Sequence, residues 1–378
     1  MTGPSVEEVV ILSPLALPAT GGAAIYTDIL ARHLIARNVT RRVTLLTEAH
    51  PDAPSSEQHD GGRRLIRRVF PYRASCPTRQ RDRHWRYLVQ NFGFARYLRR
   101  AWSPRSILLV HGSFLIHPCS LDWLLPALRR RRPGPALIAD LRDPRLPPSR
   151  FRRLAPFDRI ISCGEAVTRH VTTDTRTASR LHEIPIPFEA PNRPPDADAI
   201  AAGYGLTPGR FVLWPNGLLA RKGLAPAIEA VRRLRERGEA GVTLAVTGPA
   251  RDLDGQSRRA MAVGDLRYLG PLPHDRLIAL ATAAGVVLFL SEIEGLPRSA
   301  LEAIAVGARV LLPPGVPEFA RHCPECIPAT ADPAALAATI TDTLYTHSPV
   351  ADYPLDRHAP EIVTPAYRAV FEAALRNA

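Results

Sequence analysis

Two glutamates, Glu294 and Glu302, stand with seven residues between them, just after the apolar run 286–290. Pro297 suits the first turn of a helix, so the segment is expected to pass from a strand through a loop into a helix. The free N–H groups at 296–299, with the positive helix end behind them, would form an anion site. The two carboxylates could then bind separate hydroxyl groups. Carboxylates on a solvated helix surface are the alternative.

Lys222 is the only lysine among 49 basic residues. It follows the strand-like run 211–215 and a turn that contains Gly217, and it stands just ahead of an expected helix. A site that needs a compact ammonium as a point charge on phosphate is one place where arginine is not equivalent. Lys222 is therefore a candidate to neutralise a diphosphate leaving group without a divalent cation. A solvent-exposed helix cap is the alternative.

Two weaker signals involve glycine and cysteine. Gly21 and Gly22 open a helix after the first apolar run and would let the backbone approach a ligand, although they do not form G-x-G-x-x-G. Cys323 and Cys326 form a lone C-x-x-C beside prolines, which favours a loop over a zinc site. Because no cluster of Asp or His at ligand spacing is found, neither a metal nor another cofactor is expected.

Short apolar runs alternate with longer amphipathic stretches along the whole chain, which is typical of parallel sheets covered by helices. Strands are expected near 9–13, 42–47, 64–70, 106–111, 135–140, 158–162, 211–215, 242–247, 265–269, 286–290 and 308–312. Helices are expected near 23–37, 83–102, 119–131, 164–174, 223–237, 274–283, 297–306, 332–346 and 360–375.

The 378 residues suit two domains, and the proline-rich stretch 185–198 reads as a linker between them. We expect an N-terminal domain over 1–187 and a C-terminal domain over 195–353. The predicted fold is α/β, with two Rossmann-like domains that face a central cleft. Ligands of such sheets bind beyond the carboxyl ends of the strands.

The net charge of +13 lies wholly in the first half, where residues 1–190 hold 30 Arg and 16 Asp or Glu, which gives +14. This half could hold an anionic acceptor, an acidic membrane surface or nucleic acid, and a solvated, solubilising face is the alternative. Most of the excess comes from three groups, namely Arg63 to Arg68, Arg79 to Arg86 and Arg129 to Arg132.

No apolar run approaches the roughly 18 to 20 residues that would cross a bilayer. The start carries Glu7 and Glu8 where a secretory signal would have basic residues. Five scattered cysteines argue against a disulfide framework. We therefore expect a cytoplasmic protein, with peripheral contact to the inner membrane face through the basic half as an additional hypothesis.

Taken together, these motifs resemble those of glycosyltransferase family 4, whose members are retaining enzymes of the GT-B fold. Glu294 and Glu302 match the E-x7-E motif of the family, and Pro317-Glu318 is similar to the P-E that follows it. The resemblance is strongest over 211–318. Weaker matches are Gly21-Gly22, the strand that ends at Gly248, the stretch 268–272 and the segment 160–167.

The resemblance implies a role for each matched residue. Glu294 would contact the donor sugar, Glu302 the ribose and Lys222 the diphosphate, while Gly21-Gly22 would reach the phosphates from the opposite domain. The C-terminal helix, 360–376, would pack back on the first domain. The remaining donor-binding candidates are Asn216, Arg221, Gly295, Leu296 and Pro297.

The sequence departs from the family pattern at two positions. Gly217 stands where many members have Arg, so Arg221 would supply the second cation, or Lys222 would act nearly alone. Arg142 stands where many members have a His beside the acceptor. We include Arg142 with Lys222 and Glu294 among the predicted catalytic residues, although the role of that His does not carry over.

The sequence thus predicts a metal-independent, retaining glycosyltransferase that uses a nucleotide-diphosphate sugar. The acceptor hydroxyl could belong to a cell-envelope glycan, a lipid-linked precursor or a small natural product such as an antibiotic intermediate. A nucleotide-sugar epimerase of the same architecture is one alternative. A basic nucleic-acid-binding protein is another, although no nucleic-acid-binding motif is evident.

Overall fold

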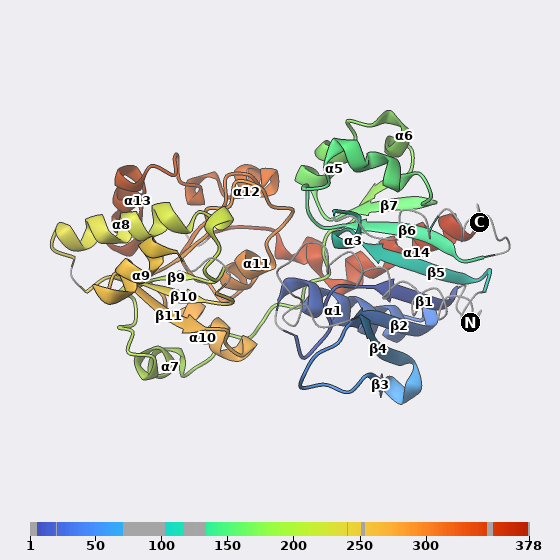
Figure 1. Cartoon of the computed structure of the whole chain (residues 1–378), viewed down its shortest axis with the longest axis horizontal. Coiled ribbons are helices and arrows are strands. Elements are labelled where there is room, and N and C mark those ends of the chain that lie inside the picture. Colours follow the sequence, from blue (N-terminus) through green and yellow to red (C-terminus); the bar gives the residue numbers. More distant parts are fainter. Residues whose placement is uncertain are drawn as a thin grey trace. The chain divides into compact units, whose positions relative to one another are not determined.

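The chain divides into two compact units in the computed structural model (Figure 1). Unit 1 consists of Met1–Glu189 and Asp356–Ala378, and unit 2 of Ala190–Leu355. The structure describes residues 6–19, 21–70, 103–116, 125, 134–239, 241–250, 254–345 and 351–376. The expected helix at 83–102 lies outside the described residues, as does nearly all of the one at 119–131.

Unit 1 contains an eight-stranded sheet in the order β3-β4-β2-β1-β5-β6-β7-β8. All neighbouring strands are parallel except the β3–β4 pair. The central strands β1, β5 and β6 are largely buried and mostly apolar, as parallel strands are when helices cover both faces. The bounds are β1 Val6–Leu12, β2 Thr40–Glu48, β3 Ser56–His59, β4 Arg64–Phe70, β5 Ser106–His111, β6 Ala136–Leu141, β7 Arg159–Ser162 and β8 Leu181–Glu183.

The C-terminal helix of the chain, α14 (Pro360–Arg376), packs in unit 1 against α1 (Gly22–Ala36), β5 and β6. Its buried residues include Tyr367 and Phe371, whose rings meet edge to face at 5.7 Å. The chain therefore returns to unit 1 after completing unit 2. The other described helices of this unit are α3 Ser113–Ile116, α5 Glu165–Val171 and α6 Thr175–Ala178.

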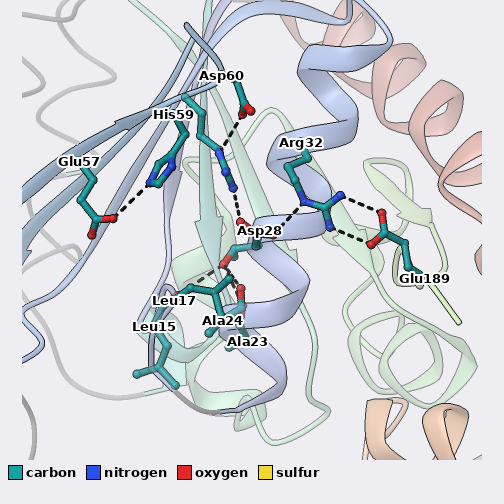
Figure 2. Close-up of polar contacts among 12 residues, drawn as sticks. Leu15, Leu17, Ala23, Ala24, Asp28, Arg32, Glu57, His59, Asp60 and Glu189 are labelled. Atoms are coloured by element: carbon teal, nitrogen blue, oxygen red, sulfur yellow. Dashed lines mark hydrogen bonds and ion pairs between the residues drawn. The ribbon is translucent and has the colours of Figure 1, made fainter. Parts of the chain in front are cut away.

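A network of ion pairs connects α1, β4 and Glu189, the last residue of the first segment of unit 1 (Figure 2). Arg32 donates to both oxygens of Glu189, at 3.0 and 2.8 Å, and to Asp28 at 2.9 Å. Arg64 pairs with Asp28 and, at 3.0 Å, with Asp60. Arg64 is only 8% exposed, so it does not add to a basic surface as its charge alone suggested.

Unit 2 contains a fully parallel five-stranded sheet in the order β11-β10-β9-β12-β13. All five strands expected in the second half are present, as β9 Phe211–Trp214, β10 Thr243–Thr247, β11 Leu266–Gly270, β12 Val286–Leu288 and β13 Val310–Leu311. Together with the sheet of unit 1, this arrangement confirms the predicted α/β class with two Rossmann-like sheets.

Helices cover both faces of the sheet in unit 2. On one face α8 packs against α9 and α13, and on the other α10 packs against α7 and α11 (Figure 1). Trp214 of β9 is fully buried and packs in the core between the sheet and α8. The bounds are α7 Ala197–Gly203, α8 Leu224–Glu236, α9 Gly255–Ala262, α10 His274–Ala283, α11 Arg298–Ala305, α12 Pro317–His322 and α13 Pro333–Tyr345.

Within the described residues, no helix is both long enough and apolar enough to cross a membrane.

Candidate active site

The strand order of unit 2 determines where a ligand can bind. From β9 the chain proceeds to β10 and β11 on one side, and it then returns to place β12 on the other side of β9. The loops that follow β9 and β12 therefore diverge to opposite faces at a topological switch point. In open parallel sheets the ligand crevice forms at such a point, beyond the carboxyl ends of the two strands.

Lys222 lies in the loop that follows β9, in a short 3₁₀ turn over Ala220–Lys222. The buried Trp214 fixes the start of this loop because its indole N–H donates to the Gly217 carbonyl at 2.9 Å. Gly223 ends the 3₁₀ turn with φ of 87°, and a Cβ there would lie 2.8 Å from Leu290 Cβ. Only glycine fits this close approach, which brings Lys222 to the end of β12.

Glu294 lies in the other loop, between β12 and α11, and its carboxylate forms an ion pair with the ammonium group of Lys222. Both side chains are largely buried, with 12% of Lys222 and 13% of Glu294 exposed. The loop packs closely against Gly315, where a Cβ would come within 1.9 Å of the Glu292 carbonyl oxygen. The structure thus brings together, at the switch point, two predicted residues that are far apart in sequence.

Glu302 lies inside α11 with only 5% of its side chain exposed. Its Oε1 accepts hydrogen bonds from Arg298 Nε at 2.9 Å and from His274 Nε2 at 3.0 Å. Neither the Arg298 nor the His274 side chain was predicted from the sequence to have a role. The spacing of Arg298, four residues before Glu302 on an expected helix, was a usable signal, whereas nothing in the sequence connected His274 with either residue.

The other donor-side candidates line the same two loops. Asn216 is partly buried, and no described residue forms a hydrogen bond with its side-chain nitrogen. Arg221 is exposed. Pro297 is the N-cap residue of α11, preceded by the buried Gly295 and Leu296. The start of α11 therefore lies at the carboxyl end of β12, where the first N–H groups of a helix favour an anion.

Gly21 and Gly22 belong to unit 1, where Gly21 is the N-cap of α1 with φ of 133°. Both are exposed. They follow β1, and the strand order changes direction between β1 and β5, so this helix start also lies at a switch point, that of the first sheet.

Arg142 is also in unit 1, just after β6, and only 9% of its side chain is exposed. Its guanidinium lies 4.2 Å above the ring of Tyr26 and donates to the Tyr26 hydroxyl at 2.6 Å. It also donates to the hydroxyl of Tyr367 and pairs with Asp140 at 2.5 Å. Burial opposes its charge, but the Asp140 carboxylate keeps the pKa of Arg142 well above its ordinary value.

These contacts give Arg142 a place inside unit 1, where it joins α1, β6 and α14. Burial also raises the pKa of Tyr367, so its phenol stays protonated as a hydrogen-bond donor. Two nitrogens of Arg142, Nε and Nη1, have no hydrogen-bond partner among the residues that the structure describes. The catalytic role predicted for Arg142 stays a prediction.

The cysteine pair does not form part of the site. Burial raises the pKa of Cys323 to about 11 and that of Cys326 to about 12, so both thiols are protonated near neutral pH. In the part of the chain that the structure describes, no three His, Cys, Asp or Glu side chains gather as a metal site would require.

Comparison with known proteins agrees with this arrangement. Residues 209–345, which contain both loops of the site, match the family of glycosyl transferases group 1. The chain is 28% identical over 329 residues to a 2-deoxystreptamine N-acetyl-D-glucosaminyltransferase of Streptomyces fradiae, with 79% of this chain and 75% of that protein covered.

The fold of the whole chain is also found in solved structures. A UDP-forming alpha,alpha-trehalose-phosphate synthase from Burkholderia xenovorans superposes with a TM-score of 0.68 at 15% identity, covering 98% of this chain and 100% of that one. The E. coli structure bound with UDP-2-fluoro glucose gives a TM-score of 0.66 at 16% identity, with 97% of each chain covered. Residues 209–345 thus match the glycosyl transferases group 1, and the chain is a nucleotide-sugar-dependent glycosyltransferase of the GT-B fold.

Proposed function

We propose that this glycosyltransferase transfers a hexose or N-acetylhexosamine, with retention at the anomeric carbon, to a hydroxyl group of a small natural product. Among the acceptor classes that the sequence leaves open, the Streptomyces relative supports the natural product, because its name states 2-deoxystreptamine as acceptor and N-acetylglucosamine as the transferred sugar. Retention is supported by the match of Glu294 and Glu302 to the E-x7-E motif.

The observation that carries the proposal is the ion pair between Lys222 and Glu294 at the switch point of unit 2. A nucleotide-diphosphate sugar needs positive charge at its phosphates and a hydrogen-bond acceptor at its sugar hydroxyls. The pair supplies one of each, from adjacent loops, beside the start of α11. An ammonium group held by a carboxylate in a largely buried site is preorganised to meet the charge that develops on a leaving group.

During transfer the bond between the anomeric carbon and the diphosphate oxygen breaks, and the electron pair leaves with the diphosphate. The acceptor oxygen bonds to the anomeric carbon, and its proton passes to the departing diphosphate oxygen. Lys222 and the first N–H groups of α11 stabilise the leaving diphosphate, Glu294 orients the sugar and Glu302 binds the ribose. We further propose that Gly21-Gly22 and Arg142 of unit 1 take part in the transfer.

Turnover of the variant Lys222→Ala tests the proposal. Removal of one well-placed electrostatic donor should lower kcat by about a hundredfold or more. The matched control is Arg232→Ala, which removes a cation of α8 that is 42% exposed and pairs only with surface glutamates among the described residues. Near-normal turnover of Lys222→Ala would remove Lys222 from the mechanism.

Product analysis tests the reaction class. The chain is incubated with nucleotide sugars, with and without 2-deoxystreptamine, and the products are examined by mass spectrometry and proton NMR. We expect a glycoside whose anomeric configuration equals that of the donor. An inverted product would refute retention, and conversion of the donor without any acceptor would identify an epimerase.

We further propose a cytoplasmic location and a peripheral contact between the basic first half and acidic lipid. The arginine groups 79–86 and 129–132, on which this contact depends, lie outside the described residues. Co-sedimentation with vesicles of phosphatidylglycerol and phosphatidylcholine should fall steeply with salt. Equal binding to vesicles of phosphatidylcholine alone would contradict the contact.

A further inference from the structure

The carboxylate of Glu302 is held by two donors that come from different helices. Arg298 approaches along α11 itself, one turn before Glu302, and 8% of its side chain is exposed. His274 is the first residue of α10 and is 44% exposed. Both donors reach the same oxygen, Oε1, at 2.9 and 3.0 Å.

This arrangement leaves the two oxygens of Glu302 unequal. Oε1 already accepts two hydrogen bonds, whereas no described side chain or backbone group donates to Oε2. An ionised carboxylate accepts about four hydrogen bonds in all. Because the donors come from two directions, the carboxylate cannot rotate without losing one of them, so Oε2 is the oxygen left for a ligand hydroxyl.

The His274 ring can donate this hydrogen bond either as the neutral tautomer that carries a hydrogen on Nε2 or as the charged imidazolium. A carboxylate only accepts, so Nε2 must carry a hydrogen to lie 3.0 Å from Oε1. The neutral Nε2–H tautomer and the imidazolium both satisfy this requirement.

We propose that Arg298 and His274 are positioning residues for donor selection, which hold Glu302 so that Oε2 accepts the ribose hydroxyls of the nucleotide. The inference rests on the proposed function, because it requires that Glu302 bind the ribose. It adds the two residues that orient this contact, and it predicts that they determine how strongly the enzyme prefers a ribonucleotide to a deoxyribonucleotide.

The test measures dissociation constants by calorimetry on the full chain. UDP, GDP, ADP and CDP are screened first, and whichever binds is compared with its 2′-deoxy and 3′-deoxy forms. We expect the wild type to prefer the ribonucleotide to at least one deoxy form by about tenfold, as befits a hydrogen bond to a charged group. His274→Leu should lower this preference about threefold or more, mainly by weakening binding of the ribonucleotide.

Two controls separate positioning from general damage. His274→Gln keeps an amide N–H at a comparable reach and should restore the preference. Arg276→Leu alters the same helix at a similarly exposed side chain, 46% exposed, and should leave the preference unchanged. Arg298→Met removes the cation from a buried carboxylate, so its preference is read only if its thermal unfolding shows a folded protein.

The outcomes distinguish the inference from the proposed function. If no nucleotide binds the wild type, the donor site itself is refuted. If the wild type prefers the ribonucleotide and His274→Leu keeps the full preference, or weakens ribo and deoxy forms equally, the positioning role is overturned while the donor site stands. A wild type without any ribose preference overturns the inference as well.

Discussion

His358 should make the folded state sensitive to mild acid. The residue lies where the chain re-enters unit 1, is 1% exposed, and through Nδ1 contacts the Ile186 carbonyl at 3.1 Å. The Phe188 N–H in turn donates to the His358 carbonyl at 2.9 Å, so the segment that leaves unit 1 is tied to the segment that returns. Burial lowers the pKa of His358 from 6.5 to about 4.

The sign of the effect follows from the lowered pKa. Between pH 6.5 and about 4 the unfolded chain binds a proton at His358 and the folded chain does not, so the free energy of unfolding falls as the pH falls. At about 1.4 kcal/mol per pH unit, the gap between the two pKa values corresponds to roughly 3 kcal/mol. The full stability is present above pH 6.5.

The variant His358→Asn isolates this contribution. Its amide can still donate to the Ile186 carbonyl but does not titrate. Urea unfolding of both proteins is followed at intervals from pH 7.5 to pH 4, so that carboxylates common to both cancel in the difference. The wild type should lose roughly 3 kcal/mol more than the variant over this range. Parallel curves would refute the reasoning, because they would show that His358 titrates alike in both states.

Three further predictions concern residues that shape the two units. Gly223→Ala should lower the free energy of unfolding by about 2 kcal/mol, because φ of 87° disfavours a side chain, and it should weaken nucleotide binding; an unchanged midpoint in urea would contradict this strain. The hydrogen bond from Arg32 lowers the pKa of Glu189 to about 2. The ionised Glu189 therefore stabilises the folded state fully above pH 4.5, and this stabilisation is lost as the pH falls toward 2. Since 41% of the Glu189 side chain is exposed, Glu189→Gln should lower the free energy of unfolding by less than about 1 kcal/mol at pH 7. A larger fall in Tm than that of a surface control variant would show that solvent does not screen this ion pair. Tyr367→Phe removes a hydroxyl bound to Arg142 inside unit 1 and should cost about 1 to 3 kcal/mol in urea unfolding; no loss would show that the hydroxyl is dispensable.

Much of the fold could be predicted because buried parallel strands are read directly from apolar runs. Every strand expected from the sequence is present within a few residues of its expected bounds. Two strands were missed, β3 and the three-residue β8. Strand β3 has no such signal, because its residues Ser-Glu-Gln-His alternate between exposed and half-buried. It pairs antiparallel with β4 at the edge of the sheet. Its presence depends on that neighbour and not on its own sequence.

The sequence indicated candidate residues for the site but not their contacts. The family motif indicated Glu294 and Glu302, and the uniqueness of Lys222 indicated a special role. Neither signal showed that Lys222 would pair with Glu294, because that contact depends on β9 and β12 being neighbours in the sheet. The contact of Arg142 with Tyr367 could not be read from the sequence either, because it depends on α14, a helix from the far end of the chain.

The central claim is that the Lys222–Glu294 pair marks the diphosphate site of a nucleotide-sugar donor. The most direct measurement is the thermal shift of the chain with each nucleoside diphosphate in the presence of chelator, repeated for Lys222→Ala and Arg232→Ala. One nucleoside diphosphate should raise the Tm of the wild type and of Arg232→Ala, and it should lose this effect in Lys222→Ala. Stabilisation that is equal in Lys222→Ala and the wild type, or absent for every nucleotide, would contradict the account.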